Sequence, residues 1–426
     1  MKRVLFYLIL ALLLLGYASC TKSVDIGSEK PEPIESIEPA EPIEPAEPIE
    51  LTVRQSEIVA CNNAFSFGMF KEVAALNGAN TFFSPLSLNM ALGMLYNGTS
   101  GDTRTEMAEV LGMADFTETE INEYCQKMMW ALLEIDPLTD IGIANSIWYR
   151  DGFPVKQPFI NINQQYFDAM VQSLDFGKSD VADIINNWCA DKTKDRIREI
   201  IEKPISPNIM MYLINALYFK SKWESEFDKA NTKQADFTKA NNSKIPVNMM
   251  EQTTFFPYYA DQYLQCIEMP YGNQAFSMIA ILPASDMNID QLIGYLDNTK
   301  FQHIVDNLYH HKIWLQLPRF KIECDMDLND PVKNVGMKLI FHGGFANISD
   351  IALQVSYIRQ KTFVEVNEEG AEAVAVTVIG VISGVSSPQQ PALPVMFHAN
   401  RPFLYLIKEK STGAILFIGR MDEPKE

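Results

Sequence analysis

The sequence has few histidines and none of the local motifs on which most catalytic sites are built. It contains five histidines, and none stands in an H-E-x-x-H arrangement. It has no G-x-S-x-G nucleophile elbow, no G-x-x-x-x-G-K-[ST] loop and no G-x-G-x-x-G loop. His310 and His311 precede an expected strand, where neighbouring side chains diverge. We therefore expect no enzyme and no cofactor, although a Cys–His pair brought together by folding would leave no local signature.

The six cysteines lack the spacing of a metal site or of a disulfide framework. They lie far apart, with no C-x-x-C pair and no histidine at zinc-ligand spacing. Without Cys20, an odd number remains: Cys61, Cys125, Cys189, Cys266 and Cys324. We expect no metal, and we expect these five thiols to be mostly buried and to behave as small apolar residues.

Basic residues are scarce, with 35 Lys and Arg against 54 Asp and Glu, for a formal net charge of −19. This balance argues against a nucleic-acid partner, because binding phosphates needs clustered positive charge. Apolar residues make up 47% of the 426-residue chain, which is enough for a sizeable core.

The N-terminus has the pattern of an export signal. Lys2 and Arg3 precede an apolar run from Val4 to Leu15, which is too short to span a membrane as a helix. Small residues then lead to Cys20, a pattern that resembles the lipobox of bacterial lipoproteins. The resemblance implies that residues 1–19 are a lipoprotein signal peptide and that Cys20 is lipidated. The protein would then be exported and lipid-anchored in the bacterial cell envelope, at the outer membrane or cell surface. A plain signal peptide is the alternative.

The next segment, residues 20–51, is expected to be a spacer. Within residues 29–50 glutamate recurs at every third position, and proline does so from residue 39 to residue 48. This period matches the three residues per turn of a polyproline II helix. At about 3.1 Å per residue, 22 residues would reach up to roughly 70 Å. An unstructured acidic linker is the alternative, and it would also act as a spacer.

From residue 52 onward the sequence is typical of an α+β domain. Helical spacing predicts a helix over 52–76, and Ser84 followed by Pro85 predicts the start of a second helix ending near Tyr96. Further helices are expected at 102–111 and 184–201. Met210–Phe219 is so apolar that we expect it in the middle of a sheet. Strands are expected at 81–83, 141–149, 264–269, 276–282, 312–317, 362–366, 403–407 and 415–420.

The most unusual segment runs from Asn367 to Pro394. Its composition from Ala373 to Val385 favours a strand, since it lacks charge and proline and is rich in β-branched residues. Its flanks, charged on one side and rich in Ser, Pro and Gln on the other, are typical of an exposed loop. The segment is either an ordinary core strand or a loop held out that can later join a sheet.

Several motifs give the chain a specific resemblance to the serpin family. The run from Glu368 to Ala375 looks like the hinge of inhibitory serpins. Other stretches resemble serpin signatures in the same order along the chain: 80–87, 215–220 with Trp223, 227–237, 397–403 and 415–420. The match spans about residues 52–423. It implies the serpin fold, with eight or nine helices, smaller sheets and a large central sheet that can accept the loop as an extra strand.

The resemblance implies a serpin domain over residues 52–426 with its reactive loop at about 368–394. A protease would cleave this loop, and the freed side would insert into the central sheet and trap the enzyme. The implied hinge residues are Glu368, Glu369, Gly370, Ala371, Glu372, Ala373, Val374 and Ala375. The implied sheet-opening region contains Ser84, Ser87, Asn215, Gln360 and Trp223. Gln360 stands where serpins commonly have histidine, and Ala371 replaces the usual hinge threonine.

The alternation of small and apolar residues defines an insertion face. It consists of Ala371, Ala373, Ala375, Thr377, Ile379 and Val381, while Glu372 falls on the opposite face. Three bonds are candidates for cleavage: Gly384–Val385 by counting from the hinge, Val385–Ser386 by its serine, and the bond after Ile382. No Arg or Lys lies nearby, so we expect an elastase-like or subtilisin-like target, or a papain-like one. A monomeric inhibitor is expected, and a non-inhibitory serpin-fold binding protein of the envelope is the alternative.

Overall fold

Helices dominate the first part of the domain, where apolar residues recur at helical spacing. The computed structural model describes residues 44–77, 80–370 and 393–426. Helix α1 covers Val53–Asn77, and α2 covers Pro85–Tyr96 with Ser84 as its cap, the Ser84 side chain accepting a hydrogen bond from the Ser87 amide. Both predicted helices are confirmed. The other helices are α3 (Gly101–Val110), α4 (Glu118–Glu134), α5 (Gln157–Phe167), α6 (Val181–Lys192), α7 (Ile289–Tyr295), α8 (Asn298–Asp306) and α9 (Asn329–Asn334).

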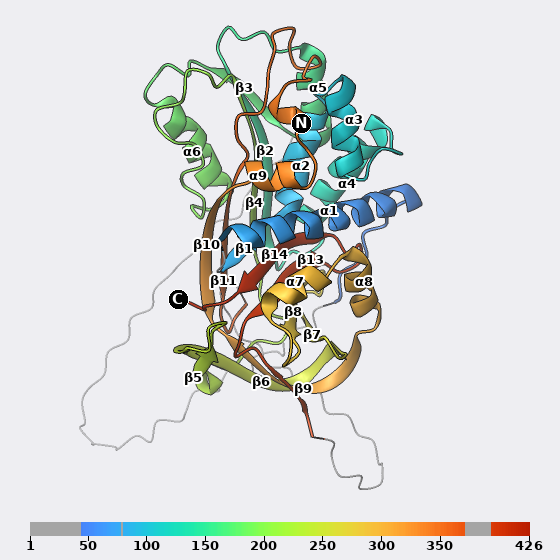
Figure 1. Ribbon diagram of the computed structural model, residues 1–426, viewed down its shortest axis with the longest axis vertical. Helices are drawn as coiled ribbons and strands as arrows, with labels where there is room; N and C mark the ends of the chain where they lie inside the picture. Colours follow the sequence, from blue (N-terminus) through green and yellow to red (C-terminus); the bar gives the residue numbers. More distant parts are fainter. Residues whose placement is uncertain (1–43, 78–79, 371–392) are drawn as a thin grey trace, which may run out of the picture. The chain divides into compact units, whose positions relative to one another are not determined.

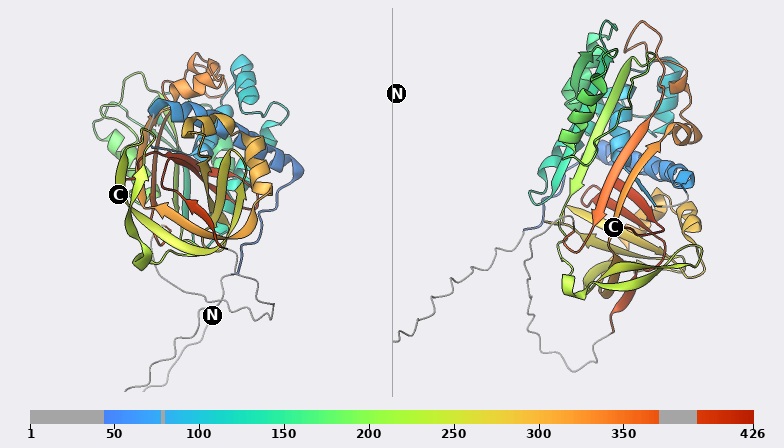
Figure 2. Two further views of the ribbon diagram at one scale, coloured as in Figure 1. Left: turned by 60° about the horizontal axis from the view of Figure 1, so that its bottom comes forward. Right: turned by 90° about the vertical axis from the view of Figure 1, so that its left-hand side faces the viewer.

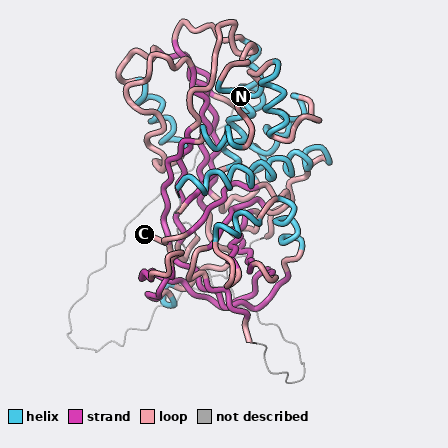
Figure 3. Tube along the Cα trace, viewed as in Figure 1, coloured by secondary structure: helices cyan, strands magenta, loops and turns pink. Residues whose placement is uncertain are grey.

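Strands dominate the rest of the chain, and Figure 3 shows most of them in the lower part of the view with most helices above. The strands are β1 (Thr81–Phe83), β2 (Asp140–Arg150), β3 (Met170–Leu174), β4 (Met211–Lys220), β5 (Lys233–Thr238), β6 (Lys244–Ala260), β7 (Leu264–Pro270), β8 (Phe276–Pro283), β9 (Tyr309–Pro318), β10 (Phe320–Asp327), β11 (Arg359–Val366), β12 (Val395–His398), β13 (Phe403–Glu409) and β14 (Ile415–Met421). Short 3-10 turns lie at η1 (Lys229–Asn231) and η2 (Leu339–Phe341).

The described strands form three hydrogen-bonded sheets. The largest has nine strands in the order β1-β14-β13-β8-β7-β6-β9-β12, with β5 paired to β6. Its middle strands β8, β13 and β14 are buried along their whole length, so the main core lies against them. The others are a three-stranded sheet, β3-β2-β4, and the two-stranded pair β10-β11. The fold is α+β, as the sequence predicted (Figure 1).

The two smaller sheets lie next to each other, with β4 beside β11. The right-hand view of Figure 2 shows the green β4 next to the orange β10–β11 pair. Tyr212 at the start of β4 is in ring contact with Tyr357, just before β11, and Lys222 beyond the end of β4 forms a bridge to Gly370, just after β11. Because contacts at the start of one strand match contacts at the start of the other, β4 and β11 run in the same direction.

Two sequence expectations need correction. The helix expected at 184–201 ends at Lys192, because Lys194 and Asp195 adopt the left-handed conformation, with φ of 49° and 63°. The Thr193 hydroxyl caps this break by accepting a hydrogen bond from the Ile197 amide. The second correction concerns Met210–Phe219, which was expected in the middle of a sheet. As β4 it lies at the edge of its hydrogen-bonded sheet, with β11 beyond that edge.

Some expectations fall outside the described residues. The signal peptide, Cys20 and most of the spacer lie in residues 1–43, and the insertion face and the candidate cleavage sites lie in residues 371–392. The last part of the expected spacer is described and contacts the domain. The Ala46 amide donates to the Asn273 carbonyl at 2.9 Å, the Ile49 amide donates to Ser411 Oγ at 2.9 Å, and Lys127 donates to the Glu50 carbonyl.

Candidate functional site

The expected hinge begins with a buried carboxylate, Glu368, whose side chain is almost fully covered. Arg319 Nε donates to both of its oxygens at 2.7 Å, and the Thr232 hydroxyl donates to one of them. Burial alone would raise the pKa of Glu368, but the hydrogen bonds from Arg319 and Thr232 outweigh it and hold the pKa below its ordinary value. The start of the hinge is therefore held by a charge-assisted network.

The backbone of the hinge is held by the segment that follows β4. The Phe227 amide donates to the Glu368 carbonyl at 2.9 Å, and the Trp223 amide donates to the Glu369 carbonyl at 3.1 Å. The indole of Trp223 donates to the Asn367 carbonyl at 2.9 Å and stacks on Tyr271 with ring centroids 4.4 Å apart. Trp223 thus links the residues that follow β11 to the segment that follows β4.

Gly370 adopts a conformation and a position that only glycine tolerates. Its φ is +99°, and a Cβ there would lie 2.5 Å from the Trp223 amide nitrogen and 2.6 Å from the Ser221 carbonyl oxygen. Its own backbone forms antiparallel bridges with Asn367 on one side and Lys222 on the other. Gly370 therefore already lies between the two neighbouring strands as the first residue of a strand would.

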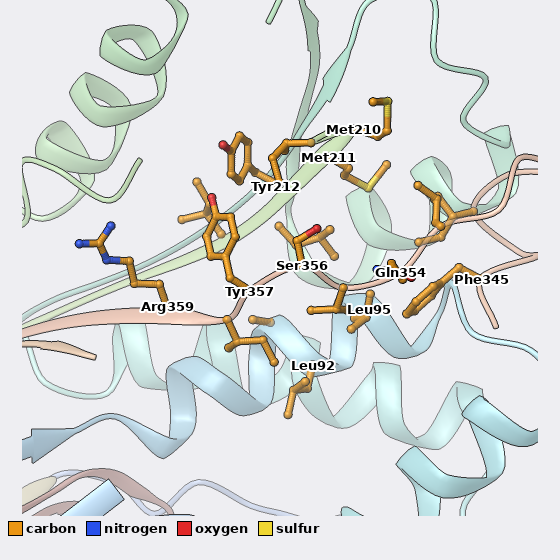
Figure 4. A pocket seen from close by; sticks show the side chains of 18 of the residues that line it. Leu92, Leu95, Met210, Met211, Tyr212, Phe345, Gln354, Ser356, Tyr357 and Arg359 are labelled. Atoms are coloured by element: carbon orange, nitrogen blue, oxygen red, sulfur yellow. The ribbon is translucent and has the colours of Figure 1, made fainter. Parts of the chain in front are cut away.

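Below Gly370, β4 and β11 are separated by a gap that we call the slot. Among the described residues no ladder joins the two strands, and a cavity of about 890 Å³ lies between β4, α2 and the segment 342–362. Leu92, Leu95, Met211 and Phe345 supply apolar lining (Figure 4). A smaller pocket, with Tyr218, Phe219 and Phe363 in its walls, continues the slot toward the hinge.

The middle of the slot contains four of the expected sheet-opening residues. Gln360 Oε1 accepts from the Ser84 amide and Gln360 Nε2 donates to the Ser84 carbonyl, both at 2.8 Å. Asn215 Nδ2 donates to Asn145 Oδ1 at 2.8 Å, and the Ser87 hydroxyl donates to the Asn215 carbonyl at 3.5 Å. Within the described chain Asn215 Oδ1 is buried without a hydrogen-bond partner. Gln360 therefore binds the residue that caps α2, while Asn215 Oδ1 on β4 is a buried acceptor left unsatisfied within the described chain.

Side chains cross the slot where backbone hydrogen bonds are missing. The rings of Tyr212 and Tyr357 meet with centroids 6.0 Å apart (Figure 4). Arg196, in the loop after α6, lies 4.8 Å above the ring of Phe363 and lines the same small pocket as Tyr218. In the same loop, Glu202 accepts from Arg359 at 2.7 Å. The two walls are therefore held together mainly by side-chain contacts.

The structure separates the sequence-predicted residues into two places. Ser84, Ser87, Asn215 and Gln360 meet in the middle of the slot, whereas Trp223 lies at the hinge. The residues that sequence reasoning missed are Arg319, Thr232, Tyr212 and Tyr357, which contact the site from other elements. An arginine 49 residues before its carboxylate partner gives no local signal.

The cysteines, which were expected to be mostly buried thiols, can be compared with the described chain. Cys125, Cys189, Cys266 and Cys324 are buried free thiols and Cys61 is partly buried, which confirms the expectation of mostly buried thiols. Burial raises the pKa of Cys189 to about 12. Residues 44–77, 80–370 and 393–426 contain no group of three or more His, Cys, Asp or Glu side chains suited to a metal ion. None of the described helices is long and apolar enough to cross a membrane.

The described chain thus combines an α+β fold with a gap between two strands that do not pair with each other, and Gly370 is bridged to the residues that follow each of them. The profile of the serpin family, described as serine protease inhibitor, matches residues 60–424. The chain therefore belongs to the serpin family. The activity that the family description gives is the inhibition of serine proteases in general.

Relatives from distant organisms support the assignment along most of the chain. Iripin-3 of the tick Ixodes ricinus is 32% identical, covering 86% of this chain and 94% of its own. Human serpin B3 is 31% identical, with coverage of 85% and 98%. An uncharacterised serpin-like protein of Thermococcus kodakarensis is 30% identical, with coverage of 88% and 87%.

Solved structures agree with the fold. Native tengpin, a thermophilic serpin, superposes with a TM-score of 0.78 at 30% identity, covering 89% of this chain and 97% of its own. Thyroxine-binding globulin in complex with thyroxine gives a TM-score of 0.77 at 25% identity, with coverage of 87% and 100%. This similarity confirms the predicted fold class.

Proposed function

We propose that this protein inhibits a protease as a suicide substrate, with the loop after Gly370 entering the slot once it has been cut. The observation that carries the proposal is the double bridge of Gly370 to Asn367 and Lys222. These bridges give the entering segment an antiparallel direction relative to both walls. A strand that continued from Gly370 would extend an arrangement whose first residue is already in position.

The bridge to Asn367 also sets a register against β11. Continued without a bulge, it would bring Ala373 opposite Val364 and Thr377 opposite Gln360. Alternate residues of β11 would lie on the same side of the sheet as the insertion face, and they are buried: Gln360, Thr362, Val364 and Val366. The odd-numbered loop residues, chosen from the sequence as the insertion face, would therefore point into the core.

The bridge to Lys222 gives the matching register against β4. It would place Thr377 opposite Asn215, so the entering hydroxyl would lie between Asn215 and Gln360. Asn215 Oδ1 is the buried acceptor without a partner, and a threonine hydroxyl is a donor of the right reach. Insertion would therefore satisfy a group that the resting slot leaves unsatisfied.

The energy of insertion is large enough to deform a protease. About 12 inserted residues would form roughly 10–20 backbone hydrogen bonds at about 0.5–1.5 kcal/mol each. The sum is on the order of 10–20 kcal/mol, comparable with the roughly 5–15 kcal/mol stability of a typical domain. The free energy released on insertion could therefore distort an enzyme that is attached to the loop by an acyl bond.

The loop sequence supports a target that prefers small aliphatic residues. Val381, Ile382 and Val385 surround the candidate bonds, and Gly384, Val385 or Ser386 would take part in cleavage. We include elastase-like and subtilisin-like serine proteases in the proposal, with a papain-like enzyme as a further target class.

The test is to incubate the full chain in detergent with elastase, subtilisin or papain and to separate the products on denaturing gels. An SDS-stable adduct is expected with at least one of them, and mass spectrometry of the released C-terminal fragment identifies the cleaved bond. Cleavage without any adduct would refute suicide inhibition.

A second function, a serpin-fold protein that binds without inhibiting, is favoured by one observation. Gln360 holds both backbone polar groups of Ser84, a contact that would resist movement of α2 against β11. One structural relative, thyroxine-binding globulin, is solved with thyroxine bound. Clean cleavage of the loop with no covalent product is the outcome that this second function predicts.

The place of action is proposed from the N-terminus. Lipidation at Cys20 would anchor a monomeric inhibitor to the cell envelope, with residues 20–45 as a spacer, since Ala46 and Ile49 already contact the domain. Labelling cells with a radioactive fatty acid tests this. Cys20→Ala is expected to lose the label and to be recovered in the soluble fraction, and unchanged labelling would exclude this site.

A further inference from the structure

Helix α2 ends in an asparagine that is followed by glycine, the pair of residues in which asparagine most readily loses its side-chain amide. Asn97 is the residue that ends α2, and it is 5% exposed. Gly98 has no side chain to hinder its backbone nitrogen, which is the atom that attacks in this reaction. The sequence contains the same pair once more, at Asn77–Gly78.

The loss of the amide needs two neighbouring groups to meet. The Gly98 nitrogen attacks Cγ of Asn97, loses its proton to water and expels the side-chain nitrogen as ammonia, which closes a succinimide ring. Water then opens the ring at either carbonyl, and the product is aspartate or iso-aspartate. No electrons are exchanged with another molecule, and water is the only other reactant. The pair can therefore react without an enzyme wherever the chain lets the two groups meet.

The folded protein holds the two groups apart. Asn97 Nδ2 donates to Asn122 Oδ1 at 3.0 Å and to Asn163 Oδ1 at 3.3 Å, and Asn122 Nδ2 donates back to Asn97 Oδ1 at 3.0 Å. The Gly98 amide donates to the Leu95 carbonyl at 2.8 Å. Ring closure also requires the Gly98 nitrogen to eclipse Cβ of Asn97, and the helical ψ of −24° at Asn97 turns that nitrogen away. The native contacts thus oppose the reaction.

The product of the reaction does not fit the place that Asn97 occupies. A carboxylate has only acceptors, so the oxygen that replaces Nδ2 would face the acceptors Asn122 Oδ1 and Asn163 Oδ1 in a buried site. Iso-aspartate would also lengthen the backbone by one carbon beside Gly98. That backbone is closely packed, because a Cβ on Gly98 would lie 2.3 Å from Cγ1 of Ile348.

We infer that Asn97–Gly98 is a spontaneous modification site that stays unreacted in the native protein and deamidates once the end of α2 opens. Leu92 and Leu95 of the same helix line the slot, so movement at the slot and opening of this site involve one element (Figure 4). A reacted chain cannot restore the contacts of Asn97, and each such opening becomes irreversible. The site would therefore remove opened molecules from the native population, whether or not they inhibit a protease.

The test follows deamidation by mass spectrometry of peptides from the full chain, incubated in detergent and mildly alkaline buffer at 37 °C. In concentrated urea Asn97 and Asn77 should react at similar rates, because glycine follows both. In the folded protein Asn97 is expected to react more than about a hundredfold more slowly than in urea, since the reaction tracks the population of the open form. In dilute urea the rate at Asn97 should rise before the native fluorescence signal is lost.

One variant separates the local contacts of Asn97 from global stability. Asn122→Ala removes the reciprocal hydrogen bonds and should speed deamidation of Asn97 in the folded protein about tenfold. Asn186→Ala is the matched control. It removes an equally buried asparagine from α6, where the side chain bonds the backbone of Ile200 and Ile201, and it should leave the rate at Asn97 unchanged.

Three outcomes would overturn the inference. If Asn97 reacted as fast in the folded parent as in urea, the native contacts would not protect it. Equal acceleration by Asn122→Ala and Asn186→Ala would mean that global unfolding governs the reaction and that opening of α2 does not. If deamidated chains refolded from urea to the melting temperature of the parent, the product would fit the site and the opening would not be irreversible.

Discussion

The slot between β4 and β11 and the centre of the large sheet are built from similar residues but completed to different degrees. Strands β8, β13 and β14 are buried along their whole length and paired by backbone ladders, with one irregularity between Ile407 and Lys408. Strand β4 is just as apolar, yet among the described strands only β2 pairs with it, and a cavity lies on its other side. Strands of similar composition are thus fully paired and closely packed in one region, and unpaired along one edge beside a cavity in the other.

The difference shows that apolar composition alone does not tell whether a strand has its partners. Apolar residues on both faces of a strand reflect the layers that cover the sheet, which for β4 are α2 on one face and α6 on the other, and they do not report how many strands are hydrogen-bonded to its edges. The side-chain contacts across the slot, such as Tyr212–Tyr357, are discrete and separable. A ladder of backbone hydrogen bonds is lost only cooperatively, so the slot is the region that can open.

The largest effect is expected from Ala371→Arg. In the proposed register this residue enters beside Ser221 and Val366, which are both buried, and burying an unpaired charge costs several kcal/mol. The variant should be cleaved with little or no trapping, and the stoichiometry of inhibition should rise more than about tenfold by active-site titration. Glu372→Arg, on the opposite face, is the control and should trap nearly normally. Full trapping by Ala371→Arg would contradict insertion.

The next effect compares the two regions directly by stability. Leu406→Ala removes a fully buried side chain from β13 and should lower the free energy of unfolding by about 2–5 kcal/mol. Leu213→Ala on β4 makes the same chemical change at the wall of the cavity and should cost less than about 1 kcal/mol. Urea unfolding followed by tryptophan fluorescence measures both values. Equal losses would mean that the slot is packed as tightly as the core.

The hinge carboxylate gives a smaller effect with a defined pH dependence. The pKa of Glu368 is lowered in the folded protein, so its contribution to stability is fully present above the ordinary carboxyl value of 4.5. This contribution is lost as pH falls through the lower, folded pKa. Glu368→Gln should reduce stability by about 1–3 kcal/mol near neutral pH, and the difference from the parent should shrink in acid. Melting temperatures between pH 3 and 7 test this, and a difference that does not change with pH would exclude the ionised pair as its cause.

The smallest effect is expected from Arg196→Ala. The guanidinium lies over the ring of Phe363 on β11 and lines the same pocket as Tyr218 on β4, and a cation–π contact of this kind is worth about 0.5–1 kcal/mol. Its loss should speed spontaneous opening roughly twofold to fivefold, seen as faster loss of inhibitory activity during incubation at 37 °C. Arg198→Ala is the control, because Arg198 is 74% exposed in the same loop and, among the residues that the structure describes, pairs with nearby Asp195. If the two variants lost inhibitory activity at equal rates, Arg196 would not be one of the residues that hold the two walls of the slot together.

Local chemistry made part of the fold predictable. The start of α2 followed from Ser84 and Pro85, because a cap and a proline in the first turn act within a few residues. The end of α6 did not, since it depends on the left-handed residues Lys194 and Asp195. The predicted position of β4 was wrong because its composition is that of a strand inside a sheet. The sequence does not show that one edge of this strand lacks a hydrogen-bonded neighbour among the described strands.

The candidate site was predictable to a similar degree. Gly370 was identified from the hinge pattern, and its positive φ and close backbone contacts give the physical reason for glycine there. The partnership of Glu368 with Arg319 joins residues far apart in the sequence, so it appeared only when the chain was folded. The role of Gln360 also needed coordinates, because an amide can bind many partners and only the structure shows that it holds Ser84.

The short turn between Asn367 and Gly370 has a kinetic consequence. Closing a chain into a first antiparallel contact is the slow, entropically unfavourable step of strand formation, and each later pair then adds with little further loss of freedom. Here the first contact exists before any cleavage. Strand addition from this turn would proceed as a one-dimensional zipper with its nucleus already formed. Under the proposed mechanism this process would compete with hydrolysis of the acyl-enzyme, and the relative rates of the two would decide whether the protease is captured or released.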